Sequence, residues 1–135
     1  MNQAKYLGTW QLIPELSIYQ SGEPPGSGLY VISAEGDNIN FEISWTDLAG
    51  QSHELAFGGP LDGNLHETDA HGVTHVMYEA IDERTLDSTA FADELIVLYA
   101  HRVASEDGEL LAVSQTQPGE QGTVTNFQVY RRQVP

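Results

Sequence analysis

The chain has 135 residues, the size of a single domain, and 40% of them are hydrophobic, including two Trp, six Tyr and four Phe, which is enough for a core. It contains no cysteine, which excludes disulfides, a thiol nucleophile and thiolate metal ligands. Twenty acidic residues against five basic ones give a net charge of −15, which repels phosphate backbones and anionic lipid, so we expect no nucleic-acid partner.

The N-terminal segment, residues 1–6, lacks the apolar core of a secretory signal. No apolar run is long enough to span a bilayer, the longest being residues 95–100. We therefore expect one domain over residues 1–135, a cytoplasmic location and no membrane insertion.

Turn-forming residues divide most of the chain into runs of roughly 6–10 residues, the usual length of strands. The least strand-like stretch is 14–28, where the sequence allows one short helical turn. Residues 39–45 alternate apolar and polar side chains, which predicts one buried and one solvated face. Residues 109–117 and 123–132 form the final predicted hairpin, joined by 118–122.

The run 95–99 is apolar at every position. Such a strand is either covered on both faces or meets another subunit, and we favour a homodimer contact.

Short strands joined by tight turns predict an all-β fold, an up-and-down antiparallel β-barrel of about 8–10 strands, because closure removes exposed sheet edges. A barrel of this size either fills itself with side chains or holds one small ligand.

Gly8-Thr9-Trp10 resembles the G-x-W signature of the lipocalin and fatty-acid-binding-protein superfamily, the calycins. Segments 12–17, 82–85, 102–108 and 126–130 are similar to segments that occur in the same order in small bacterial lipocalin-like domains, which carry no established activity. The resemblance implies that Trp10 closes one barrel end and that Arg131 or Arg132 stacks on its ring, a cation–π contact.

Two departures from these families concern the ligand. Fatty-acid-binding proteins hold the ligand carboxylate with an Arg-x-Tyr pair in the last strand, where this chain has Gln128-Val129-Tyr130. A neutral amide hydrogen-bonds a head group but does not balance a buried carboxylate. The tryptophan motif continues as 11–14 without the further glycines of nitrobindin-like haem barrels, so we expect no cofactor.

The predicted ligand-binding residues are the large side chains of the central strands and the polar pair of the last strand: Phe41, Ile43, Trp45, Phe57, Met77, Tyr99, His101, Gln128 and Tyr130. Two orientations of the strand at 95–103 remain open. In one, Tyr99 and His101 point inward as a polar pair. In the other, Arg102 is the interior charge and the natural anchor for an anionic ligand.

Three histidines, His66, His71 and His75, have metal-compatible spacing, but a turn followed by a strand brings only two of them together, so we expect no metal site.

The leading hypothesis is binding of a small hydrophobic or amphipathic molecule inside the barrel. One alternative is a filled barrel that acts as a dimeric interaction or structural module. The other is an enzyme that uses His101 or His75 as an acid–base group in the cavity. The interior volume discriminates among them.

Overall fold

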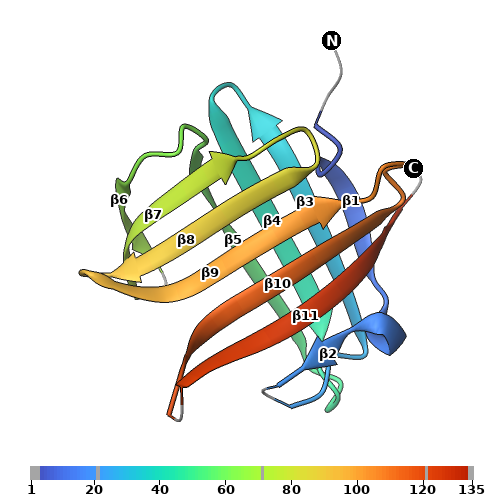
Figure 1. Cartoon of the computed structure of the whole chain (residues 1–135). Helices are drawn as coiled ribbons and strands as arrows, with labels where there is room; N and C mark the ends of the chain where they lie inside the picture. Colours follow the sequence, from blue (N-terminus) through green and yellow to red (C-terminus); the bar gives the residue numbers. More distant parts are fainter. Residues whose placement is uncertain (1–3, 21, 71, 121, 134–135) are drawn as a thin grey trace.

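The computed structural model describes residues 4–20, 22–70, 72–120 and 122–133. This part of the chain forms eleven β-strands and one short 3₁₀ helix, η1 (Figure 1). The elements are β1 (Gly8–Leu12), η1 (Pro14–Leu16), β2 (Ile18–Tyr19), β3 (Ser27–Glu35), β4 (Asn38–Thr46), β5 (Ser52–Pro60), β6 (His66–Ala70), β7 (Val73–Ala80), β8 (Thr85–Ala92), β9 (Leu95–Ala104), β10 (Leu110–Gly119) and β11 (Gly122–Arg132). None of the helices in the described ranges has the length and apolarity needed to cross a membrane.

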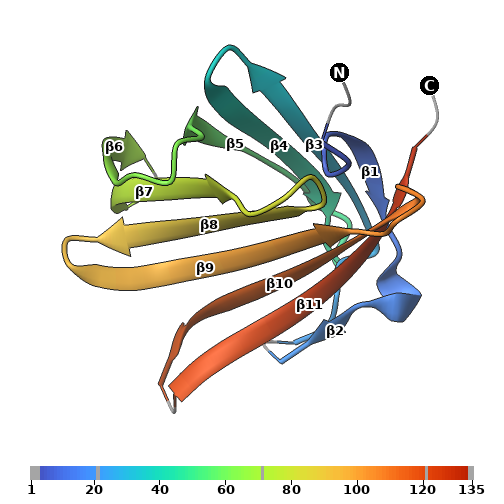
Figure 2. The ribbon, with the colours of Figure 1, turned by 45° about the horizontal axis from the view of Figure 1, so that its top comes forward.

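One antiparallel sheet contains all the strands, in the order β5-β4-β3-β1-β11-β10-β9-β8-β7-β6, with β2 paired to β11 beside this path. β1 joins the two halves of the chain, because Trp10 lies opposite Tyr30 of β3 and Arg132 of β11. The sheet curves into a nearly closed barrel whose ladder ends at β5 and β6 (Figures 1 and 2). The predicted all-β antiparallel barrel is therefore confirmed.

Side chains fill one half of the barrel. The alternation of residues 39–45 is observed: Ile39 and Phe41 are buried, and Glu42 is exposed. Phe41 stacks on Phe57 of β5 at 4.8 Å and lies 5.6 Å from the Tyr78 ring of β7, so aromatic contacts join β4 and β5 to β7. The buried core of this half includes Tyr6, Trp10, Tyr30, Ile32, Ile39, Phe41, Tyr78, Leu86, Ala104 and Leu111.

Trp10 lies within this filled half. Its indole nitrogen donates to the Tyr6 carbonyl at 3.0 Å, and the Arg132 guanidinium lies 4.3 Å from the ring centroid. Arg132 also donates to the carbonyls of Lys5, Leu7 and Gly108. Of the two candidate arginines, Arg132 therefore stacks on the tryptophan, and Arg131 is exposed.

The inward-facing orientation of Tyr99 and His101 is wrong. Arg102 is 1% exposed and points into the barrel, whereas Tyr99 is 37% exposed on the opposite face of β9. The small side chains of Ala100 and Ala104 flank Arg102 on the inner face and leave room for its long side chain. Met77 also lies outside, because its neighbours Val76 and Tyr78 are the residues of β7 that face the core.

Candidate functional site

A pocket of about 480 Å³ occupies the end of the barrel where β2 and the β4–β5 turn lie together (Figure 1). We call this the pocket end. The lining comes from seven strands, the 22–26 loop and the β4–β5 turn, and consists of Leu12, Tyr19, Glu23, Pro25, Gly28, Ile43, Trp45, Asp47, Leu48, Leu55, Gln115, Gln128 and Tyr130. Ligand sites commonly measure 300–1,000 Å³, so this volume suits a small molecule.

The walls are mainly apolar because inward-facing positions of the strands carry large hydrophobic side chains. On β4, Ile43 and Trp45 continue the inward series that Ile39 and Phe41 begin in the core. Leu55 of β5 is the cross-strand partner of Ile43 and also lines the pocket. The same alternation that builds the core at one end therefore lines the cavity at the other.

Polar groups converge on one wall. The Tyr130 hydroxyl donates to Oε1 of Gln128 at 2.6 Å, and Nε2 of Gln128 donates to Oε1 of Gln115 at 2.7 Å. Gln128 is 6% exposed, and burial raises the pKa of the Tyr130 phenol well above its ordinary value. Burial also raises the pKa of Tyr19. The phenols are therefore neutral at physiological pH and act as hydrogen-bonding groups.

Arg102 lies in the filled half and is not part of the pocket lining. Its Nε donates to the Tyr30 hydroxyl at 2.7 Å and its Nη1 to the Ser88 hydroxyl at 2.9 Å. The guanidinium lies 4.5 Å from the Phe41 ring centroid. The Tyr30 ring is 5.4 Å from that of Tyr130, which lines the pocket, so aromatic side chains stand between the cation and the cavity.

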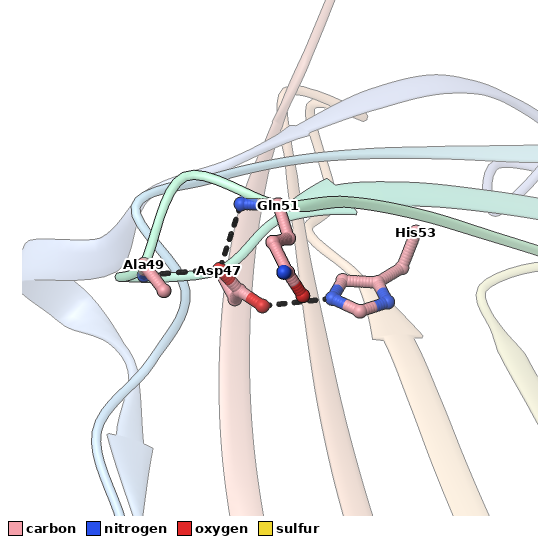
Figure 3. Close-up of polar contacts among 4 residues, drawn as sticks. All are labelled: Asp47, Ala49, Gln51 and His53. Carbon is pink, nitrogen blue, oxygen red and sulfur yellow. Dashed lines mark hydrogen bonds and ion pairs between the residues drawn. The ribbon is translucent and has the colours of Figure 1, made fainter.

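The rim of the pocket includes the β4–β5 turn, where Asp47 organises the backbone (Figure 3). Its carboxylate accepts hydrogen bonds from Ala49 N at 3.0 Å, Gln51 N at 2.9 Å and His53 Nε2 at 2.8 Å. The bond from His53, and then those from the backbone, lower the pKa of Asp47. The His53 ring also stacks on Trp45 at 5.2 Å, which ties this turn to the pocket wall.

Among the predicted ligand-binding residues, Ile43, Trp45, Gln128 and Tyr130 line the pocket. Phe41 and Phe57 pack in or against the core. Met77, Tyr99 and His101 lie on the outer face, which corrects their predicted placement in the cavity. The prediction missed several lining residues, chief among them Leu12, Tyr19, Leu55 and Gln115.

On the outer face, Asp87 accepts hydrogen bonds from the Tyr99 hydroxyl at 2.8 Å and from His101 Nδ1 at 2.5 Å. Partial burial and the neighbouring Asp87 carboxylate raise the pKa of Tyr99 to about 12. His75 also lies outside, next to the Thr74 hydroxyl. Neither His75 nor His101, the two histidines of the acid–base alternative, is among the described residues that line the pocket.

The three-histidine motif does not come together within the described residues. His66 pairs with Asp62 at 2.9 Å, while His75 contacts Thr74, and His71 lies outside the described residues. No group of three or more potential metal ligands occurs among the residues that the structure describes.

No family model matches the chain, and no curated protein matches it. Several solved structures, however, are similar to this chain. The fatty acid transporter REP1-NXSQ superposes with a TM-score of 0.64 at 15% identity, covering 98% of both chains. The fluorescent protein UnaG gives 0.63 at 19% identity, covering 96% of this chain and 98% of that one. Zebrafish ileal bile acid-binding protein in complex with cholic acid gives 0.61 at 15% identity, covering 96% and 99%.

These matches show that the chain has the fold of the fatty-acid-binding-protein and lipocalin-type barrels, which confirms the expectation from Gly8-Thr9-Trp10 at the level of the fold. At such identities the likeness extends to the fold alone.

Proposed function

We propose that the protein binds a small apolar or amphipathic molecule in the pocket between β2, β4, β5 and β11. The observation that carries this proposal is a cavity of about 480 Å³ with apolar and aromatic walls and one polar cluster. Transfer of a ligand's apolar body from water into such a cavity contributes roughly 25 cal/mol per Å² of buried surface. The polar cluster then orients the head group.

The solved relatives support the general class of ligand. One is named as a fatty acid transporter and another as a bile acid-binding protein complexed with cholic acid. Because only the fold is shared, the ligand of this chain is inferred from its own pocket. The pocket at one end of the barrel, beside the core, favours ligand binding over a barrel filled throughout.

The test measures binding of an environment-sensitive apolar dye and compares two variants of adjacent residues. Leu55→Trp places a larger ring in the pocket, whereas Ala56→Trp adds the same ring at an exposed position on the other face of β5. We expect Leu55→Trp to weaken dye binding at least tenfold and Ala56→Trp to leave it within about twofold, because only Leu55 lines this pocket. Equal effects of both changes, or no binding by the unmodified protein, would contradict the proposal.

Native mass spectrometry of freshly purified protein provides an independent readout. A co-purifying small molecule, retained by the unmodified protein and lost from Leu55→Trp, is the expected result. Its chemical identity then names the ligand directly.

A homodimer and a cytoplasmic location stay predictions from the sequence. Leu95 and Ile96 at the start of β9 are 73% and 52% exposed, as a subunit contact requires before association. We expect light scattering to give the mass of a dimer and the Ile96→Asp variant to give that of a monomer. A monomeric unmodified protein would rule out this contact.

A further inference from the structure

We infer that the pocket selects its ligand by head group, accepting a neutral hydrogen-bonding group such as an alcohol or a primary amide and rejecting a carboxylate. This inference rests on the proposed function and names the ligand class for the same site. It follows from three features of the structure: the charges of the lining, the isolation of Arg102, and the polar cluster of Gln115, Gln128 and Tyr130.

The described lining contains no positively charged side chain. Its only charged residues are Glu23 and Asp47, and both are acidic. A carboxylate that enters an apolar pocket loses its hydration, and it is stable there only when a cation pairs with it. The residues of this pocket provide no such cation, and the two acids at the mouth oppose the approach of an anion.

Arg102 is the candidate anchor for an anionic ligand, but its side chain packs in the core. Two of its nitrogens already donate, to Tyr30 and Ser88, and the guanidinium lies against the Phe41 ring. At 1% exposure, it reaches a ligand only if the aromatic side chains around it are displaced. A ligand in the pocket therefore gains no ion pair from Arg102.

The polar cluster matches a neutral head group. Gln128 holds Gln115 and Tyr130 in a chain of hydrogen bonds at one wall of the pocket. Gln128 also hydrogen-bonds the Tyr19 phenol. Each amide has two N–H groups and an oxygen with two lone pairs, so Gln115 still has N–H groups to donate and the amide oxygens still have lone pairs to accept. An alcohol or amide uses both kinds of capacity, whereas an ionised carboxylate only accepts.

The net charge of −15 acts in the same direction. The surface field lowers the local concentration of anions and leaves that of neutral molecules unchanged. A carboxylate is therefore disfavoured relative to an alcohol of the same chain length, both as it enters the pocket and once it is bound there.

The experiment compares three probes with the same ten-carbon chain: 1-decanol, decanamide and decanoate. Each displaces a neutral environment-sensitive dye at pH 8, where decanoate is ionised, and below the concentration at which it forms micelles. We expect decanol and decanamide to bind at least tenfold more tightly than decanoate.

A charge variant provides the converse test. Gln128→Arg places a cation beside Tyr130 in the pocket, whereas Gln11→Arg makes the same change of net charge at an exposed position of β1. We expect Gln128→Arg to tighten decanoate binding at least tenfold without tightening decanol binding, and Gln11→Arg to change each affinity less than threefold.

The outcomes separate the two proposals. Equal or tighter binding of decanoate by the unmodified protein overturns the head-group inference and leaves the proposed function standing. Failure of all three probes to displace the dye contradicts the proposed function itself. Should Gln128→Arg not fold, the ratio measured with the unmodified protein decides the inference alone.

Discussion

Arg102 and Tyr30 meet in the interior of the barrel, where the guanidinium Nε donates to the phenol oxygen at 2.7 Å. Arg102 forms no ion pair with any carboxylate among the described residues. Two hydroxyl groups and the face of an aromatic ring surround the charge instead. Arg102 is therefore part of the core in the filled half of the barrel, and the Tyr30 ring lies between it and Tyr130 of the pocket.

This arrangement predicts different effects for two substitutions of Arg102. Arg102→Ala leaves a cavity and removes the partner of the Tyr30 and Ser88 hydroxyls, so we expect a loss of about 3–5 kcal/mol in the free energy of unfolding. Arg102→Met fills most of the volume without a buried charge and should cost less than half as much. Denaturant unfolding measures both, and a larger loss in the Met variant would contradict this account.

The contact of Arg132 with Trp10 should contribute strongly to stability. Arg132→Ala removes a cation–π contact and hydrogen bonds to three carbonyl groups, which together predict a loss on the order of 2–4 kcal/mol. Arg131→Ala changes the neighbouring exposed arginine and should alter stability by about 0.5 kcal/mol or less. Thermal unfolding of the two variants tests this difference, and similar melting temperatures would refute it.

Gly8 lies directly beneath the same arginine. Its φ is +136°, and a Cβ at this position would lie 2.4 Å from Nη1 of Arg132. Gly8→Ala should therefore destabilise the protein by about 2 kcal/mol or more, because it combines backbone strain with a steric clash. Gly36→Ala, at a φ of +61° with open space around it, should cost about 1 kcal/mol. Equal losses in the two variants would show that the clash is relieved without cost.

The Asp47–His53 hydrogen bond should be visible in the titration of the carboxyl group. The pKa of Asp47 lies below its ordinary value of 3.8, chiefly because of His53 and then because of the backbone bonds of the turn. A lowered carboxyl pKa stabilises the folded state above the unfolded-state value and loses that contribution as the pH falls through the folded-state value. The contribution is therefore complete at neutral pH, and its loss is confined to pH values below about 5.

His53→Ala should raise the pKa of Asp47, leaving it still lowered by the Ala49 and Gln51 backbone bonds. His66→Ala removes the equivalent partner of Asp62 and should leave Asp47 unchanged. Carbon-detected NMR titration of the carboxyl groups measures both effects. An unchanged Asp47 pKa in His53→Ala would show that the histidine does not bond the carboxylate in solution.

Local patterns predicted those parts of the structure that depend on local rules. The alternation of residues 39–45 identified the inward face of β4, and with it Ile43 and Trp45 of the pocket wall. Gly8-Thr9-Trp10 indicated the barrel and the arginine contact. In the last hairpin, the strands extend to Gly119 and Gly122, because the actual turn is tighter than the predicted 118–122 loop.

The orientation of β9 was beyond sequence reasoning because both faces of residues 95–103 carry apolar side chains. Arg102 is inside because of tertiary contacts: Tyr30, its hydroxyl partner, lies 72 positions away in the chain. Tyr19 belongs to the pocket because a two-residue strand pairs with Phe127 and Asn126 of β11, and no periodicity marks so short an element. Gln115 likewise enters the site through its hydrogen bond to Gln128.

The two tryptophans permit the most direct test of ligand binding in the pocket. Trp45 lines the cavity, whereas Trp10 is buried in the filled half, with its indole N–H bonded to Tyr6. In ¹H–¹⁵N NMR spectra recorded during titration with 1-decanol, we predict a saturable shift of the Trp45 indole signal and a constant Trp10 signal. A static Trp45 signal, or equal shifts of both signals, would contradict binding at this end of the barrel.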